Sequence, residues 1–226
     1  MSVAFTSILL IPSLAILLKM EENVEIREKK LSLKLLFKDH KDIFKVYIFM
    51  FLGIFLAYSL ISLFLPEVAI KKLFSTQLES AGVVGFAANQ GLLFEIILNN
   101  FLILVVAFVL SLIYGAGAVL FLTWNASVWG VVFAFFVKET VSFGEGNLIS
   151  EFFTSIIPFL PHMTTEAIAY ISAAIAGGVV SKAVIREKLF SKKFHHIITD
   201  ALILLGMGFA LVIIAAFLEV EVFTGL

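Results

Sequence analysis

The sequence predicts an all-α, polytopic membrane protein: a helical bundle of about six transmembrane helices, with a short interfacial or re-entrant helix before the fifth. Composition is the first reason, because 61% of the residues are hydrophobic, only 15% are charged and the mean hydropathy is +1.09. Soluble domains are about half apolar and about a quarter charged. The second reason is that the apolar residues gather in runs long enough to cross a bilayer.

Taken in chain order, these runs place six helices in one integral membrane domain over residues 1–226. A membrane-spanning helix needs about 20 apolar residues. The predicted spans are 3–18, 46–65, 94–114, 118–137, 164–182 and 197–218. The first span contains Pro12, and we interpret it as retained, not as a secretory signal, because it has no basic start and no clear cleavage site.

The third and fourth spans are separated only by Gly115, Ala116 and Gly117. Two glycines allow a tight backbone turn, so this stretch favours a helical hairpin. The alternatives are one very long kinked helix or a re-entrant pair that does not fully cross the membrane.

Two further stretches are amphipathic or apolar but are not clear spans. Residues 148–160 are apolar but too short to cross, which favours the interfacial or re-entrant helix named above. Residues 29–45 alternate apolar residues with Lys and Asp, as in an inner-surface helix or a cytoplasmic extension of the second span. Asp200 is expected to begin the sixth helix, where the helix dipole favours a negative charge.

Lysine and arginine are unequally divided between the two sides of this topology. Of the 16 basic residues, eight lie in the loop 19–45 and five in the loop 182–196. Basic loops stay in the cytoplasm. Both loops are therefore predicted on the cytoplasmic side of a cell membrane, and both termini on the outer side. The opposite side is acidic, with glutamates predicted in its loops or tail: Glu67, Glu79, Glu145, Glu151, Glu219 and Glu221.

Polar residues inside the predicted spans form a candidate ligand-binding or ion-binding site near the outer face. His162 and Glu166 lie one helical turn apart at the start of the fifth span. Asn99 and Asn100 lie about one turn into the third span, with Asn100 expected to face inward, and Asn125 lies nearer the middle of the fourth. Ionisable residues inside a membrane are functional candidates by default. The structural alternative is that asparagine side chains donate to Glu166 and tie helices together.

Small residues continue the helix face that carries this pair. Ala169, Ala173, Gly177 and Ser181 recur every four residues, a spacing that lets membrane helices pack closely. Glu166 is therefore expected to point into the bundle and not toward lipid. Gly115 and Gly117 are predicted to serve the same close packing at the turn between the third and fourth spans.

The sequence contains no catalytic motif. Both H-E-x-x-H and G-x-S-x-G are absent, and no catalytic residue is assigned. A metal at the His162–Glu166 pair stays undecided, because the other histidines lie in loops on the opposite side. The lack of cysteine excludes disulfides and zinc–thiolate sites, and no cofactor and no nucleic-acid partner are expected.

Two stretches carry a resemblance to a known family: ILNNFLILVVAFVLSLIYGAGAVLFLTWNASVWG and PHMTTEAIAYISAAIAGGVVSKAVI. They resemble the stage II sporulation protein M family of integral membrane proteins, most closely its archaeal branch, over about residues 51–220. The specific features are Asn99 and Asn100 before a Gly-x-Gly, Asn125 in the next span, and a Pro-His-x-x-x-Glu motif. Where the family often has glycine after the histidine, this chain has Met163.

The resemblance implies a non-enzymatic protein that acts as a membrane scaffold or organiser of partner proteins. The bacterial namesake is similar to a scaffold for cell-wall remodelling enzymes. The alternative is a channel or transporter that uses the polar residues of the spans as its path, and an intramembrane hydrolase ranks third. The expected partners are the lipid bilayer, membrane or extracellular proteins, and a second copy of the chain.

Overall fold

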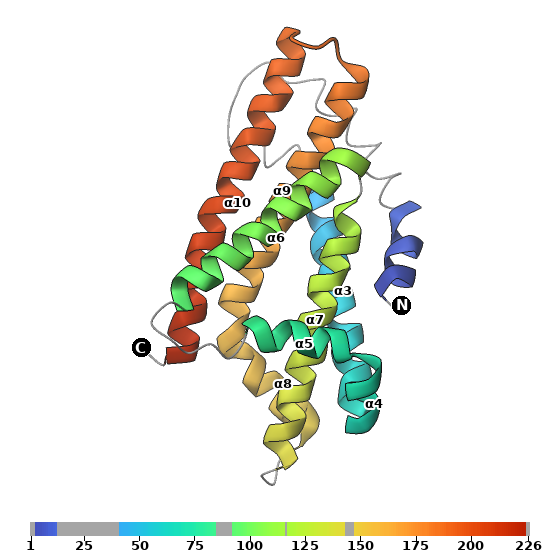
Figure 1. The fold of residues 1–226 in the computed structure, drawn as a ribbon, viewed down its shortest axis with the longest axis vertical. Coiled ribbons are helices and arrows are strands. Elements are labelled where there is room, and N and C mark those ends of the chain that lie inside the picture. Colours follow the sequence, from blue (N-terminus) through green and yellow to red (C-terminus); the bar gives the residue numbers. More distant parts are fainter. Residues whose placement is uncertain (1–2, 13–40, 85–91, 116, 143–146, 225–226) are drawn as a thin grey trace.

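The computed structural model (Figure 1) describes residues 3–12, 41–84, 92–115, 117–142 and 147–224, and every regular element in these ranges is a helix. A short N-terminal helix covers Val3–Pro12. The later elements are α3 (Lys41–Phe64), α4 (Glu67–Leu73), α5 (Ser75–Val84), α6 (Leu92–Tyr114), α7 (Ala118–Ser142), α8 (Leu148–Ile156), the 3-10 turn η1 (Ile157–Phe159), α9 (Leu160–Arg186) and α10 (Lys192–Thr224). The predicted all-α class is confirmed.

Five helical segments of the described chain are long and apolar enough to cross a membrane. They are Lys41–Phe64, Leu93–Tyr114, Ala118–Ser142, Leu148–Arg186 and Lys192–Glu221. The protein is therefore a multi-pass membrane protein. The N-terminal helix is described only as far as Pro12, and the rest of the predicted span 3–18 lies outside the described residues, as does most of the loop 19–45.

Helix α10 is longer than the sixth span that the sequence predicts. Its 33 residues extend about 50 Å at 1.5 Å per residue, whereas the hydrocarbon layer is about 30 Å thick. Asp200 therefore lies about two turns inside the helix, and its predicted place at the helix start is wrong. Its carboxylate instead lies 3.5 Å from Nε2 of His196, one turn earlier on the same face.

The predicted hairpin between the third and fourth spans is present as two separate helices, α6 and α7. Gly115 has φ +65°, a left-handed conformation that costs glycine little. A methyl group on Gly117 would lie 2.3 Å from the carbonyl oxygen of Leu110, so the turn needs a glycine there as well. In Figure 1, α6 runs obliquely across α9 and α10, while α7 runs beside α3.

Helices α4 and α5 occupy a stretch that the sequence analysis treats as loop. Pro66 ends α3 because its backbone is extended (φ −58°, ψ 145°), and α4 begins directly after it. The ammonium group of Lys138 in α7 donates to the carbonyl oxygen of Leu65 and so binds the free end of α3. Helix α5 packs on α7 and lies across the bundle in Figure 1.

The predicted segment 148–160 forms α8 and the turn η1, which lead directly into α9. The side chain of Asn147 caps α8 by accepting the backbone N–H of Ile149 at 2.9 Å. Phe152 is buried, and its ring meets Phe133 of α7 edge-on at 5.3 Å. The segment therefore packs against the end of α7.

Three of the long helices, α6, α9 and α10, form one group. Helix α9 packs on both of the others, and the small residues of its predicted packing face are buried there. A methyl group on Gly177 would lie 2.3 Å from the carbonyl oxygen of Phe108 in α6, and one on Gly208 of α10 would lie 3.1 Å from that of Ala169. Ala173 is fully buried, while Ser181 is half-buried at the end of the row.

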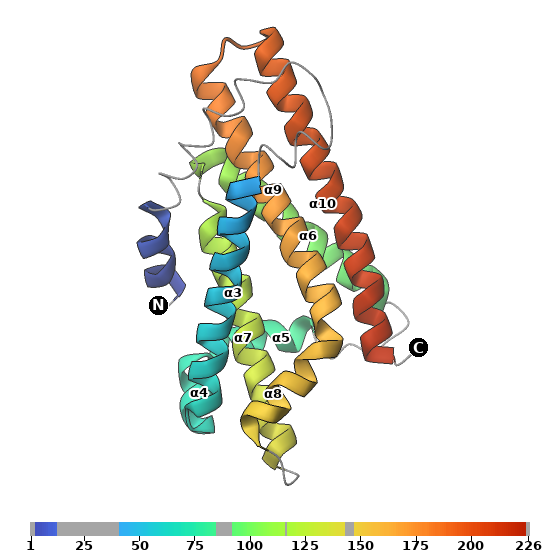
Figure 2. The same ribbon diagram turned by 180° about the vertical axis from the view of Figure 1, so that it is seen from behind.

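Helices α3 and α7 form the second group, which meets the first along a seam between α3 and α9 (Figure 2). Gly130 allows the close approach of this pair, because a methyl group there would lie 2.6 Å from the carbonyl oxygen of Phe55. The rings of Phe51 and Trp129 pack edge-on at 5.2 Å between the same two helices. The bundle is thus a pair and a trio of helices.

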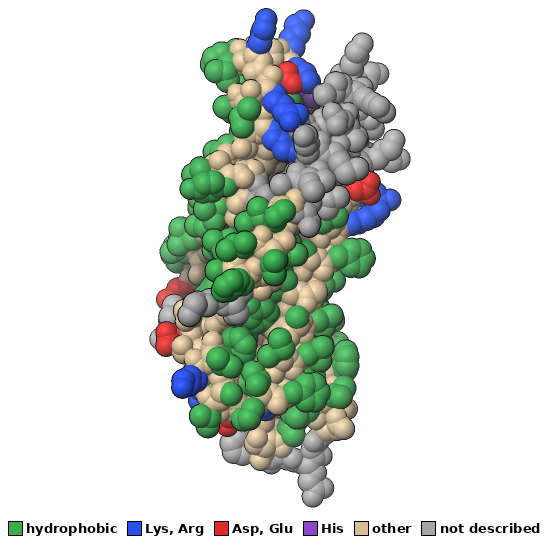
Figure 3. All heavy atoms as spheres, turned by 90° about the vertical axis from the view of Figure 1, so that its right-hand side faces the viewer, with side chains coloured by type: hydrophobic (Ala, Val, Ile, Leu, Met, Phe, Trp, Pro, Cys, Tyr) green, Lys and Arg blue, Asp and Glu red, His purple; other side chains and the backbone are tan. Residues whose placement is uncertain are grey.

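The surface agrees with a membrane environment. Figure 3 shows hydrophobic side chains over the length of the molecule and a group of Lys and Arg side chains at the end where α9 joins α10. Many large apolar side chains of the spanning helices are exposed, among them Phe49, Phe101 and Ile213. A lipid bilayer is the solvent that covers such a surface.

Candidate functional site

Four polar side chains from three helices meet inside the α6–α9–α10 group. The amide of Asn100 in α6 donates to the carboxyl of Glu166 in α9 at 2.6 Å. The hydroxyl of Tyr170, one turn along α9, donates to the amide oxygen of Asn100 at 3.0 Å. Glu219 in α10 is buried, and its carboxyl group faces that of Glu166 closely enough for the two to interact. We refer to Asn100, Glu166, Tyr170 and Glu219 as the acid–amide cluster.

The packing of the helices brings these side chains together. Glu166 and Tyr170 are four residues apart, so both project from one face of α9. Ala169, which lies between these two residues in the sequence, is fully buried. Its small side chain lets α10 approach closely at Gly208. Glu166 is 5% exposed, and its polar contacts come from protein groups. The predicted inward orientation of Glu166 and Asn100 is present in the structure.

The contact between the two carboxyl groups has a chemical consequence. An ionised carboxylate can only accept hydrogen bonds, whereas a protonated carboxyl group can also donate one. A hydrogen bond between Glu166 and Glu219 therefore exists only while at least one of the two carries a proton. The pair can hold a proton between α9 and α10, or it can serve as a link between the two helices.

The predicted place of Glu219 in an outer loop or tail is wrong. The helix continues to Thr224, so Glu219 lies within α10 and is buried. The sequence does contain a pattern that indicates its burial. Glu219 shares one helix face with three apolar residues, Val212, Ala215 and Ala216. All four are buried in the structure.

His162 lies apart from the cluster, although it is one turn from Glu166. It is buried, and its ring meets Phe159 edge-on at 5.8 Å. Within the described part of the chain, its Nδ1 atom has no hydrogen-bond partner. The structure therefore does not pair His162 with Glu166.

The two remaining predicted residues differ in their relation to the cluster. Asn99 donates to the amide oxygen of Asn100 at 3.3 Å, so it lies at the edge of the cluster. Asn125 donates to the carbonyl oxygen of Phe121 in its own helix at 3.0 Å and does not join the cluster. Of the five predicted site residues, the structure thus brings Asn99, Asn100 and Glu166 together.

The sequence does not decide whether a metal binds at this site. Among the residues that the structure describes, no group of three or more His, Cys, Asp or Glu side chains could hold a metal ion. The acid–amide cluster itself offers two carboxyl groups, one amide and one phenol.

Comparison with protein families identifies a relationship. The model of the family described as stage II sporulation protein M matches residues 43–222, which run from the start of α3 nearly to the end of α10. The match includes all four residues of the acid–amide cluster. Neither a curated protein nor a solved structure matches the chain.

Proposed function

Because the chain belongs to the stage II sporulation protein M family, we propose that it is a membrane scaffold that organises partner proteins. The observation that supports this proposal is the buried acid–amide cluster. Glu166 is 5% exposed and hydrogen-bonded to Asn100, so its polar atoms are used within the protein. Buried polar groups that satisfy one another fix the positions of membrane helices.

The proposed scaffold presents its two ends and its outer surface to other molecules. The basic loops 19–45 and 182–196 face the cytoplasm in this proposal, and both termini face outward, because basic loops are retained inside. The partners are membrane or extracellular proteins, with a second copy of the chain as a further partner. The bilayer surrounds the exposed apolar faces of the spanning helices.

The test is a complementation assay with Glu166→Gln in a strain that lacks the gene. Glutamine keeps the size and hydrogen-bonding capacity of the side chain but removes the acid. A scaffold that uses Glu166 to tie helices should retain nearly all of its activity. Abolished activity in a variant that is still inserted, monodisperse and thermally stable would overturn the scaffold proposal.

A channel or transporter is the second candidate, and the Glu166–Glu219 contact favours it. Paired carboxyl groups inside a membrane are typical of proton relays and ion pathways. The discriminating measurement is proton and cation flux in liposomes that contain the purified protein. Flux that disappears with Glu166→Gln and with Glu219→Gln supports this candidate, whereas flux that is indifferent to both excludes the pair as its site.

A further inference from the structure

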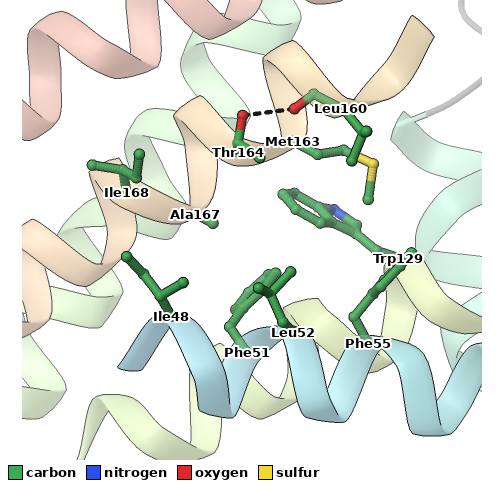
Figure 4. A pocket seen from close by; sticks show the side chains of 10 residues that line it. All are labelled: Ile48, Phe51, Leu52, Phe55, Trp129, Leu160, Met163, Thr164, Ala167 and Ile168. Atoms are coloured by element: carbon green, nitrogen blue, oxygen red, sulfur yellow. Dashed lines mark hydrogen bonds between the residues drawn. The ribbon is translucent and has the colours of Figure 1, made fainter. Parts of the chain in front are cut away.

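A separate apolar cavity lies in the seam between α3 and α9. Its volume is about 130 Å³, and none of its lining residues belongs to the acid–amide cluster. In Figure 4, the ring of Trp129 and the side chain of Met163 face the same space, with Phe51 and Leu52 of α3 on the opposite wall and Ala167 of α9 beside them.

The lining is apolar except for two side-chain groups, the indole N–H of Trp129 and the hydroxyl of Thr164. Thr164 carries the one side-chain hydroxyl among the lining residues, and this hydroxyl donates to the carbonyl oxygen of Leu160 at 2.7 Å and of Pro161 at 3.1 Å. An apolar cavity of about 150 Å³ stays dry and takes up a guest the size of benzene. The cavity therefore suits a small apolar guest.

The cavity opens onto the membrane-facing surface. Leu52, Leu160 and Ile168 line it and are 43%, 41% and 36% exposed, so its rim is open to the surroundings. The wall on α3 lies within a helix that is long and apolar enough to span the membrane. At that depth the surrounding solvent consists of lipid acyl chains.

We propose that this cavity binds the end of an acyl chain from a membrane lipid. The cavity is too small for a helix of a partner protein, whose diameter with side chains is about 10–12 Å. A flexible chain of methylene groups matches both its size and its apolar lining. The bound chain packs between Trp129 of the α3–α7 pair and Ala167 of the α6–α9–α10 group, and thus fills the seam between them.

Fluorescence of Trp129 tests the proposal directly, because the chain has two tryptophans. Trp124→Phe leaves Trp129 as the single emitter. This variant is reconstituted into vesicles of phosphatidylcholine whose acyl chains are brominated near their ends, and into unbrominated vesicles for comparison. Bromine quenches indole only on near contact, so most of the Trp129 emission should be lost in the brominated vesicles.

A variant that fills the cavity separates specific binding from general exposure to lipid. Ala167→Leu places a larger side chain in the cavity and should restore most of the emission. Ala57→Leu is the matched control, because Ala57 is an exposed residue of α3 that does not line the cavity, and its quenching should not change. Should Ala167→Leu not fold, the smaller change Ala167→Val should restore part of the emission.

The proposal fails if Trp129 is not quenched in the Trp124→Phe protein. It also fails if the folded cavity-filling variant is quenched as strongly as its parent. Quenching that appears only at a low protein-to-lipid ratio would assign the cavity to a second copy of the chain and would likewise overturn it. These readouts do not depend on the scaffold function, since they require purified protein and lipid alone.

Discussion

The side-chain amide of Asn100 donates a 2.6 Å hydrogen bond to the carboxyl of Glu166, which lies 66 positions further along the chain. This contact joins α6 to α9, and Tyr170 closes it from the same face of α9. Because Asn100 and Glu166 are both buried, their bond is shielded from competition by solvent. The contact is therefore a sensitive point for the stability of the bundle.

Asn100→Leu should lower the free energy of unfolding by about 1–2 kcal/mol, because it removes the bonds to both Glu166 and Tyr170 and each interhelical bond in a membrane is worth about 0.6 kcal/mol, up to about 1.7. Unfolding in mixed micelles measures the change. Asn99→Leu is the matched control and should lose less, since Asn99 makes only the longer contact to Asn100. Equal losses for the two variants would contradict the assigned roles.

The carboxyl pair should behave as a coupled unit in a double-mutant cycle of Glu166→Gln and Glu219→Gln. Residues in direct contact show interaction energies of about 0.5–3 kcal/mol, whereas separate sites are additive within about 0.5 kcal/mol. The unfolding free energies of the two single variants and the double variant give the coupling. Glu221→Gln in place of Glu219→Gln provides the control, because Glu221 is exposed. If the effects of Glu166→Gln and Glu219→Gln on the unfolding free energy are additive, the contact between the two carboxyl groups contributes no energy.

Gly177→Ala should destabilise the protein by about 1–3 kcal/mol, the usual cost of overpacking a close contact. The added methyl group would lie 2.3 Å from the carbonyl oxygen of Phe108 and force α9 away from α6. Gly206→Ala in α10 is the control, since a methyl group there meets nothing within 4 Å. Thermal unfolding in detergent should therefore separate the two variants, and a stable Gly177→Ala protein would show that the helices can shift at no cost.

Labelling with a membrane-impermeant maleimide should place the two ends of the bundle on opposite sides of the membrane. The chain has no cysteine, so each single introduced cysteine reports alone. Lys188→Cys, in the turn between α9 and α10, should react only after the cells are opened. Lys72→Cys in α4 should react in intact cells, and the reverse pattern would invert the proposed orientation.

The sequence predicted the helices well and their ends poorly. Hydrophobic runs identify the spans because length and apolar character are what a bilayer requires. They do not mark where a helix stops, since α10 extends beyond its apolar core at both ends, from Lys192 to Thr224. The short helices α4 and α5 have no long apolar run and were therefore missed.

For the candidate site, the sequence predicted what depends on the pattern along one helix and missed what depends on packing between helices. Small residues on one face of α9 predicted that Glu166 points into the bundle, and the choice of Asn100 over Asn99 followed from the small face on which it lies. The role of Glu219 depends on the length of α10 and on its packing against α9. Glu219 lies just beyond the predicted span 197–218, so looking for polar residues within the predicted spans does not find it. His162 lies one turn from Glu166 on the same helix, yet its Nδ1 atom has no hydrogen-bond partner among the described residues, so proximity in sequence alone does not give a hydrogen bond.

Helix α10 is longer than is needed to cross the membrane, so its length also sets the distance between the α9–α10 turn and the lipid boundary. The apolar part between Asp200 and Glu219 matches the thickness of the hydrocarbon layer, so the eight residues before Asp200 continue roughly 12 Å past it. A molecule that docks on the turn joining α9 to α10 would thus be held clear of the lipid boundary. The helix is in this sense a spacer, whichever compartment that turn faces.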